Sequence, residues 1–298
     1  MSAQPLITGK TGLLGVIGYP IQHSLSPVMH NAALVALQPG GLSDYVYVAF
    51  PVKPEELPIA INGFAAIGVQ GFNVTIPHKQ AILPFLAEIS PIAQTVGAVN
   101  TVKRAAQGWW GTNTDVQGFL APLRHLQRDW SQEQVLILGC GGSASAVVVA
   151  CAHLGCGSVA IVGRDQTKLA DFQHRYQHLG LNLAVYGWDQ LAHLLPTTTL
   201  LINTTPIGLS PQTEQSPLTE SEVALLTPGA IVYDLIYTPR PTRLLQLAQA
   251  RQLVSIDGLE MLIHQGADAL EIWIERSPPV EIMRRAALNY LDGDEHRA

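Results

Sequence analysis

Residues 134–163 limit most strongly what this chain can fold into, because thirty consecutive residues carry no Asp, Glu, Lys or Arg. Such a run is long enough to cross a bilayer, but glycines interrupt it. Gln134–Leu138 has the length of a strand, Ala146–Leu154 is rich in Ala and Val, and Ser158–Val162 is again β-branched and apolar. The run therefore predicts a strand, a glycine turn, a helix and a second strand, with strands buried on both faces. We expect a βαβ unit and no membrane span.

The turn between that first strand and the helix has the pattern Gly-x-Gly-x-x-Ala. The first glycine permits a tight turn, the second lets the backbone approach a pyrophosphate, and the small third residue lets helix and strand pack closely. The free N–H groups at the start of the helix would then face the phosphates. A dinucleotide site is expected here, and a plain tight turn is the alternative. The turn residues expected to bind the cofactor are Gly139, Cys140, Gly141, Gly142, Ser143 and Ala144. Cys140 is interpreted as a small residue rather than a redox centre, because no acid–base partner stands beside it.

The residues after the second strand bear on the choice of cofactor. An acidic side chain there suits the ribose hydroxyls of NAD, whereas an arginine suits the 2′-phosphate of NADP. Gly163 is followed by Arg164, and Lys168 comes one helical turn later, so the two cations favour NADP. Asp165 could instead accept from the ribose, and a solvated loop charge is the alternative for Arg164.

Charge is scarce along the whole chain. Only 13% of the residues are charged, with 17 basic against 23 acidic residues and a net charge of −6. The 47% of apolar residues excludes a disordered chain, and the lack of a basic excess argues against a nucleic-acid partner. The cysteines, at 140, 151 and 156, form no metal-binding pattern, so we expect no metal site and a reducing compartment. The amino-terminal residues lack the layout of a signal peptide, and we expect a cytoplasmic protein.

Strands alternate with helices along the remaining chain, which predicts an α/β fold with parallel sheets. Further strands are expected near 13–17, 45–50, 71–76, 99–103, 182–186, 199–204, 230–235 and 253–256. Helices are expected from Pro27 onward and near 54–67, 79–89, 165–179, 188–195, 242–251, 259–275 and 279–291. Ser26 would be the N-cap of the first helix, and a turn is expected around 111–115.

Lys79 is the only charged residue between Glu56 and Glu88. It follows a predicted strand, and functional sites in open α/β sheets gather at the carboxyl ends of strands. An uncharged surround would disfavour the ammonium form, which suits a general acid or base. A surface lysine on the first turn of a helix is the alternative. Asp115, after a Gly-Thr-Asn-Thr turn, is a second candidate for acid–base chemistry, and it could equally cap the helix that follows.

Several blocks, taken together, resemble the shikimate dehydrogenase family nearly from end to end. The matching blocks are GYPIQHSLSP at 18–27, NVTIPHK at 73–79, GAVNT at 97–101, GTNTD at 111–115, NTTPIG at 203–208, YDLIY at 233–237 and DGLEMLIHQG at 257–266. The resemblance implies reversible, NADP-dependent reduction of 3-dehydroshikimate to shikimate in chorismate and aromatic amino acid biosynthesis. It implies a small-molecule substrate, with the protein a monomer or a homodimer.

The resemblance also implies roles for individual residues. Lys79 and Asp115 would be the catalytic pair that relays the proton at the carbonyl which accepts the hydride. The residues expected to hold the substrate carboxylate are Ser24, Ser26 and Tyr237. The residues expected to hold the ring oxygens are Asn73, Thr75, Asn100 and Gln265. The residues expected to lie against the nicotinamide are Leu235, Gly258 and Met261, and a core position in its helix is the alternative for Met261.

Two departures from the family pattern bear on specificity. NADP-selective members usually carry Asn-Arg-Thr after the second strand, whereas this chain has Gly163-Arg164-Asp165 followed by Lys168. Lys168 keeps the charge but lacks the bidentate fork of arginine, so a less strict NADP preference is expected. The Ser-x-Ser spacing favours shikimate. The alternative is a quinate/shikimate dehydrogenase with broader cofactor use.

The resemblance further implies two domains. Residues 1–114 and the carboxyl-terminal helices 258–298 would form an α/β substrate-binding domain. Residues 115–257 would form an inserted Rossmann-like domain that binds NADP.

Overall fold

The computed structural model describes residues 7–38 and 44–295, and the chain divides into two units. Unit 1 comprises Met1–Gly118 and Ile263–Ala298, and unit 2 comprises Phe119–Leu262. Both divisions fall inside helices, namely α5 (Asp115–Leu123) and α11 (Gly258–Ile274). The expected boundaries coincide with the first residues of these helices. The structural division lies further along each one, because the first turn of each helix packs with the unit that precedes it in the chain.

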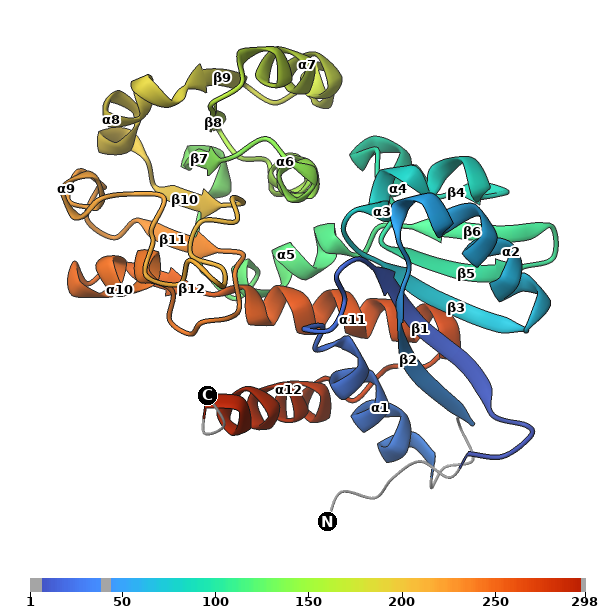
Figure 1. Cartoon of the computed structure of the whole chain (residues 1–298). Helices are drawn as coiled ribbons and strands as arrows, with labels where there is room; N and C mark the ends of the chain where they lie inside the picture. Colours follow the sequence, from blue (N-terminus) through green and yellow to red (C-terminus); the bar gives the residue numbers. More distant parts are fainter. Residues whose placement is uncertain (1–6, 39–43, 296–298) are drawn as a thin grey trace. The chain divides into compact units, whose positions relative to one another are not determined.

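In the described part of unit 1, six strands form one sheet in the order β2-β1-β3-β5-β6-β4 (Figure 1). The strands are β1 (Gly12–Gly18), β2 (Tyr45–Pro51), β3 (Val69–Val74), β4 (Glu88–Ile89), β5 (Thr101–Ala105) and β6 (Gly108–Thr112). The helices are α1 (Ser26–Leu37), η2 (Pro54–Glu56), α2 (Leu57–Ala66), α3 (His78–Ala81), η3 (Leu83–Phe85), α4 (Pro91–Val96) and α12 (Val280–Glu295). β1 pairs in parallel with β2 and β3, but β5 is antiparallel to both β3 and β6. The expectation of parallel sheets is therefore confirmed for β1, β2 and β3 of this unit, whereas β5 departs from it.

Two local expectations in unit 1 are also wrong. The helix expected at 79–89 stops at Ala81, because Pro84 cannot supply a backbone N–H and a short 3₁₀ turn follows instead. The residues after it extend the sheet, where Glu88 lies opposite Trp110 of β6. Ser26 lies inside α1 rather than capping it, and its N–H donates to the Ser24 hydroxyl at 3.3 Å.

The core of unit 1 fixes α11 against the sheet. On one face, the rings of Phe50, Phe64, Phe72 and Trp109 form a continuous series with centroids 4.8 to 5.2 Å apart. Trp273 of α11 packs on β3 at Gly71, where a Cβ would lie 2.2 Å from the indole nitrogen. That indole N–H donates to the Val102 carbonyl of β5 at 2.9 Å. Glycine is therefore required at position 71, and the close contact holds this segment of α11 in place.

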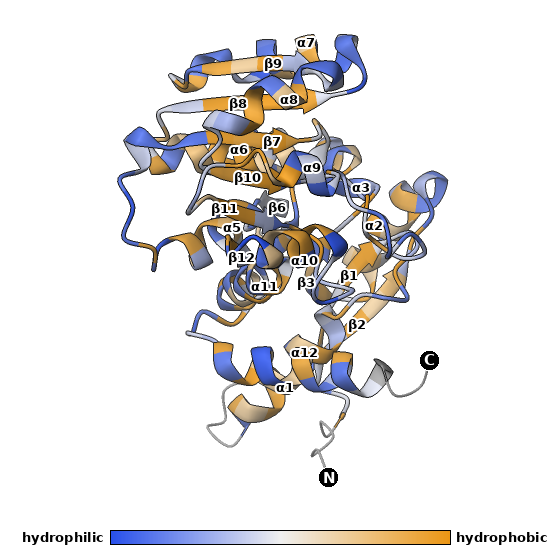
Figure 2. Ribbon diagram, turned by 90° about the vertical axis from the view of Figure 1, so that its left-hand side faces the viewer, coloured by the Kyte–Doolittle hydropathy of each residue, from blue (hydrophilic) through white to orange (hydrophobic). Residues whose placement is uncertain are grey.

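In unit 2, six described strands form a wholly parallel sheet in the order β12-β11-β10-β7-β8-β9. The strands are β7 (Gln134–Leu138), β8 (Ser158–Gly163), β9 (Leu183–Gly187), β10 (Leu200–Asn203), β11 (Ile231–Asp234) and β12 (Val254–Ile256). The helices are η4 (Trp130–Gln132), α6 (Gly142–Leu154), α7 (Gln166–Tyr176), η5 (Gln177–Leu179), η6 (Trp188–Gln190), α8 (Leu191–Leu194), η7 (Leu195–Thr197), α9 (Glu220–Val223) and α10 (Arg243–Ala250). Apolar residues line the central strands (Figure 2). Side chains of α9 and α10 pack with those of β7, β10 and β11 in one cluster.

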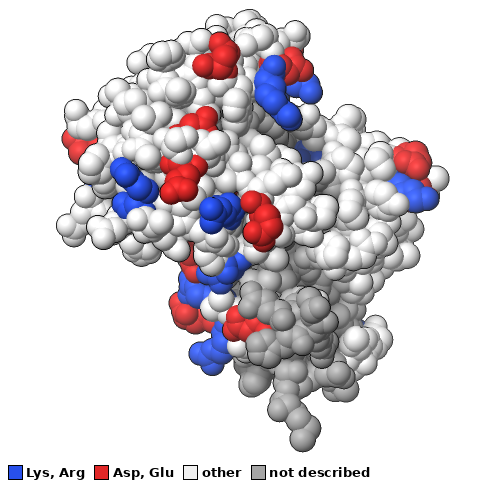
Figure 3. All heavy atoms as spheres, turned by 60° about the vertical axis from the view of Figure 1, so that its left-hand side comes forward, with Lys and Arg blue, Asp and Glu red and all other residues white. Residues whose placement is uncertain are grey.

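The uncharged run 134–163 is the β7–α6–β8 unit, as predicted. Every residue from Ala144 to Cys151 is buried, so this helix needs no polar face. Within residues 7–38 and 44–295, no helix is both long enough and apolar enough to cross a membrane. Charged side chains of both signs lie in scattered small groups on the face in Figure 3.

Candidate active site

Lys79 and Asp115 meet as a close ion pair in unit 1. The Lys79 ammonium nitrogen lies 2.6 Å from Oδ2 of Asp115, and their side chains are 25% and 11% exposed. Lys79 is in the first turn of α3, which follows β3, and Asp115 is the first residue of α5, which follows β6. The isolation of Lys79 along the sequence is therefore not an isolation in space. The short contact places a nitrogen that can donate a proton directly beside an oxygen that can accept one.

Asn100 joins this pair to α11. Its amide nitrogen lies 2.8 Å from Oδ1 of Asp115, 3.0 Å from the Thr114 hydroxyl and 3.3 Å from Oε1 of Gln265. An amide group has two hydrogens, so it satisfies at most two of these three acceptors at once. Its oxygen accepts from the Thr114 N–H at 2.8 Å, which fixes the side chain in place. Asn100 therefore lies at the centre of the contacts that surround the ion pair.

Asn73 extends the polar network toward β2 and α1. Its amide donates to the Asn100 carbonyl at 3.2 Å and to the Thr101 hydroxyl at 3.1 Å, while its oxygen accepts from the Tyr47 phenol at 2.6 Å. The Tyr47 phenol is also hydrogen-bonded to the Ser26 side chain. The carboxyl-terminal half of β3, the start of β5 and the start of α1 thus contribute to one connected set of hydroxyl and amide groups.

The remaining predicted residues of unit 1 adjoin that network. Ser24 accepts from the Ser26 N–H, and it is half-buried. Thr75 lies just past β3, two residues after Asn73, and its N–H donates to the Ile17 carbonyl of β1 at 2.9 Å. Residues two apart in extended backbone share one side of a strand, so Thr75 faces the same way as Asn73. Tyr237 belongs to unit 2, in the loop after β11.

The glycine turn of unit 2 has the geometry expected of a pyrophosphate site. Gly139 has φ +97°, and a Cβ there would lie 2.9 Å from the Thr204 hydroxyl, so the turn itself requires glycine. A Cβ at Gly141 or Gly142 would meet no heavy atom within 4 Å, so the space before α6 is open. Gly141 caps α6 without any side-chain hydrogen bond. The free N–H groups of the helix therefore face open space, which suits a phosphate ligand.

The segment after β8 has its acidic residue already engaged. Asp165 caps α7 by accepting from the Lys168 N–H at 3.1 Å, and Oδ2 lies 3.7 Å from the Lys168 ammonium. Arg164 is exposed beside it. Burial raises the pKa of the Cys140 thiol, which lowers its reactivity. A Cβ at Gly163 would lie 3.4 Å from Cys140 Sγ, so the two loops lie close together.

Gly258 lies very close to the backbone of the loop after β11. A Cβ there would lie 2.0 Å from the Leu235 carbonyl oxygen, and the Gly258 N–H donates to the Ile236 carbonyl at 3.1 Å. The start of α11 is therefore fixed against the loop after β11. Met261 is half-buried and lies in the first turn of α11, three residues after Gly258.

Sequence reasoning missed Asp234, which organises the loops at the carboxyl ends of β10 and β11. Its carboxylate accepts from the Asn203 amide at 2.9 Å, the Ile236 N–H at 3.1 Å and the Thr242 hydroxyl at 2.7 Å. Burial raises the pKa of Asp234 to about 6, although these three hydrogen bonds oppose the rise. The aspartate at the end of an otherwise apolar strand could have indicated this role, because a buried carboxylate requires hydrogen-bond donors around it.

Sequence reasoning also missed Tyr47 and His30, which lie behind the polar network of unit 1. Both are buried, with exposures of 2% and 0%. Tyr47 is in β2 and His30 is in α1. Nothing in their local sequence distinguishes them from ordinary core positions, because their partners are distant along the chain.

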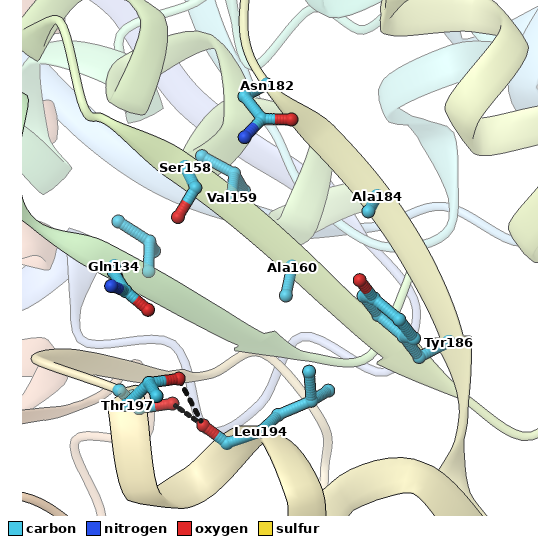
Figure 4. Close-up of a pocket in the computed structure, with 11 residues that line it drawn as sticks. Gln134, Ser158, Val159, Ala160, Asn182, Ala184, Tyr186, Leu194 and Thr197 are labelled. Atoms are coloured by element: carbon cyan, nitrogen blue, oxygen red, sulfur yellow. Dashed lines mark hydrogen bonds between the residues drawn. The ribbon is translucent and has the colours of Figure 1, made fainter.

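A hollow of about 290 Å³ lies elsewhere in unit 2 (Figure 4). Its lining includes Gln134 and Ser158, which are the first residues of β7 and β8, together with Asn182 and Tyr186. The glycine turn follows the opposite ends of these strands, after Leu138. The hollow is therefore separate from the turn that suits a dinucleotide.

Comparisons with known proteins identify the family. The family model described as the shikimate dehydrogenase substrate binding domain matches residues 16–102, and the shikimate 5′-dehydrogenase C-terminal domain matches residues 258–288. The chain is 57% identical over 290 residues to a protein of Synechocystis sp. named shikimate dehydrogenase (NADP(+)), covering 97% of this chain and 99% of the relative.

Solved structures agree with these matches. A shikimate dehydrogenase crystallised with NADP⁺ is 36% identical, with a TM-score of 0.86, covering 97% of this chain and 98% of that one. The enzyme from Thermus thermophilus, solved with NADP(H) and shikimate, is 33% identical, with a TM-score of 0.82, covering 94% and 99%. Both relationships extend over nearly the whole length of each chain. The chain therefore belongs to the shikimate dehydrogenase family.

Proposed function

We propose that this protein is an NADP-dependent shikimate dehydrogenase, which reversibly reduces 3-dehydroshikimate to shikimate in chorismate and aromatic amino acid biosynthesis. The observation that carries the proposal is the Lys79–Asp115 pair at 2.6 Å, joined through Asn100 to Gln265. A relative that is 57% identical over 97% of this chain carries that name, which supports the same reaction here.

The Lys79–Asp115 pair would perform the proton step. When an alcohol is oxidised, its hydroxyl proton must leave as the carbon loses hydride, and in reduction the carbonyl oxygen must gain a proton. NADP would supply or accept the hydride when bound. The Lys79 nitrogen and the Asp115 carboxylate would take up or return the proton at the substrate oxygen.

The neutral side chains of the network would hold the substrate. Shikimate has one carboxylate and several ring hydroxyls, which pair with hydroxyl and amide groups. The residues proposed for the carboxylate are Ser24, Ser26 and Tyr237. The residues proposed for the ring oxygens are Asn73, Thr75, Asn100 and Gln265.

The residues of unit 2 fit NADP. The open space before α6, which a Cβ at Gly141 would begin to fill, faces helix N–H groups and suits the pyrophosphate. The residues proposed to line that turn are Gly139, Cys140, Gly141, Gly142, Ser143 and Ala144. Arg164 and Lys168 would attract the 2′-phosphate, and Gly163 would lie beside the glycine turn at Cys140. The nicotinamide would lie near Leu235, Gly258 and Met261. Unit 1 would then be the substrate domain and unit 2 the NADP domain.

Side-by-side kinetics test this proposal against the broader quinate/shikimate alternative. Reduction of NADP or NAD is followed by absorbance with shikimate or quinate as the substrate. The expected result is saturable turnover of shikimate with a higher kcat/KM for NADP than for NAD. A higher kcat/KM with quinate, or with NAD, would favour the alternative.

A further inference from the structure

His30 occupies a buried position between two elements that carry proposed substrate-binding residues. Its Nδ1 lies 2.8 Å from the Ser26 carbonyl oxygen in α1, and its Nε2 lies 3.2 Å from the Gly266 carbonyl oxygen in α11. Ser26 and Gly266 are far apart in sequence, yet both contact the same imidazole ring. Gly266 directly follows Gln265, so the ring supports the backbone of two proposed substrate ligands.

The ring is neutral near neutral pH, because burial lowers the pKa of His30 to about 4. A neutral imidazole has one N–H, whereas both of its partners here are carbonyl acceptors. Only one contact is therefore a hydrogen bond, and the shorter distance assigns the proton to Nδ1 and the bond to Ser26. The contact at Gly266 is a close approach that fixes the distance between the ring and α11.

The face of the His30 ring also contacts a residue that binds Asn73. It stacks on Tyr47, with ring centroids 4.1 Å apart and an interplanar angle of 12°. The Tyr47 phenol donates to Oδ1 of Asn73 at 2.6 Å, which leaves the Asn73 amide pointing at Asn100 and Thr101. A change in the position of the His30 ring would thus move Tyr47 and, through it, Asn73.

The space around Gly266 shows how closely the ring seats against α11. A Cβ at Gly266 would lie 3.2 Å from Cε1 and 3.6 Å from Nε2 of His30. The ring would have to shift by a few tenths of an ångström to accept it. A side chain at position 266 would therefore push the His30 ring away from α11.

We propose that His30 is a positioning residue for substrate binding, which sets the spacing of Ser26 and Gln265 and holds Tyr47 against Asn73. The inference rests on the proposed function, because it assumes that these residues bind shikimate. It predicts that damage at His30 changes substrate binding while cofactor binding stays intact, because the glycine turn belongs to unit 2.

The first test compares His30→Leu with His30→Gln. Leu fills space without a hydrogen-bonding group, whereas Gln restores a planar amide. His30→Leu is expected to raise the KM for shikimate about tenfold or more, because small displacements of positioning groups are costly. Its kcat should fall by less than the KM rises, and its KM for NADP should stay within about twofold of the wild type. His30→Gln should lie between His30→Leu and the wild type.

The second test acts on the same contact from α11. Gly266→Ala is expected to give the same signature, a raised KM for shikimate with an unchanged KM for NADP, even though alanine favours the helix. Gly63→Ala is the matched control, because Gly63 is an exposed position in α2 where a Cβ meets nothing within 4 Å. It gains the same helix propensity and should leave both KM values unchanged.

The outcomes separate the inference from the proposed function. Wild-type turnover of shikimate with NADP tests the function itself. If the wild type is active and both His30→Leu and Gly266→Ala keep its KM for shikimate, the role of His30 is refuted while the proposed function stands. Equal losses in shikimate and NADP binding would also overturn it, because they would indicate general structural damage. If His30→Leu does not fold, Gly266→Ala and Gly63→Ala decide the matter.

Discussion

Asp234 is predicted to make the stability of unit 2 depend on pH, and Asp234→Asn is predicted to remove that dependence. The pKa of this buried carboxyl is raised from its ordinary value of 3.8 to about 6. One pKa unit corresponds to about 1.4 kcal/mol, so the charged form is disfavoured by about 3 kcal/mol in the folded protein. Asparagine has the same shape, and its oxygen can still accept from Asn203 and the Ile236 N–H.

The sign follows from the direction of the shift. A raised pKa in the folded state contributes stability that is fully present below the unfolded value of 3.8 and is lost as the pH rises through about 6. Integrated between pH 4.5 and 7.5, the linkage amounts to about 2 kcal/mol. Relative to the wild type, Asp234→Asn should therefore gain about 2 kcal/mol in unfolding free energy when the pH is raised over this interval.

Urea denaturation at the two pH values measures this difference, with intrinsic fluorescence as the probe. Any slope that arises from other titrating groups is common to both proteins and cancels in the comparison. A difference between variant and wild type that stays the same at pH 4.5 and 7.5 would refute the reasoning.

Three further predictions concern other sites. His30 has its pKa lowered from 6.5 to about 4, so it contributes stability above 6.5 that is lost as the pH falls toward 4. Relative to the wild type, His30→Gln should gain about 2.5 kcal/mol between pH 7.5 and 4.5 in the same urea assay, opposite in sign to Asp234→Asn. Arg164→Ala should lower kcat/KM for NADP about tenfold while that for NAD changes little. Lys168→Ala should act in the same direction, because it removes the second cation proposed to attract the 2′-phosphate. Parallel NADP and NAD kinetics check both variants, and equal losses with the two cofactors would contradict the prediction. Gly139→Ala should cost about 1–2 kcal/mol of stability because its φ is +97°. Gly141→Ala should instead keep the wild-type Tm and raise the KM for NADP. Thermal unfolding and NADP kinetics measure the two effects, and identical behaviour of the two variants would contradict the prediction.

The fold elements that sequence predicted best are those governed by local rules. The β7–α6–β8 unit follows from strand lengths and glycine placement within 134–163. Lys79 and Asp115 could be identified as candidates because each follows a strand end, but their contact depends on β3 and β6 belonging to the same sheet. The pairing distance of 2.6 Å was therefore beyond local reasoning.

The parts that sequence did not predict depend on distant partners. Glu88 and Ile89 form a strand because β6 offers them an edge, although the sequence around Pro84 suggested a bent helix. The role proposed for His30 depends on Tyr47 and Gly266, and that of Asp234 depends on Asn203 and Thr242, all of which lie elsewhere along the chain. Local sequence does not show which polar side chain is buried against a distant partner, nor which atom of that partner forms the hydrogen bond.

The proton-transfer role of Lys79 is tested most directly by the turnover number of Lys79→Ala in NADP-dependent oxidation of shikimate. The account predicts a fall in kcat of about 10²–10⁴, the usual contribution of a general acid or base, with an unchanged KM for NADP. Lys103→Ala is the matched control, because Lys103 pairs with Glu275 in the same unit and lies outside the network. It should keep the wild-type kcat. A Lys79→Ala enzyme with near-normal kcat would contradict the account.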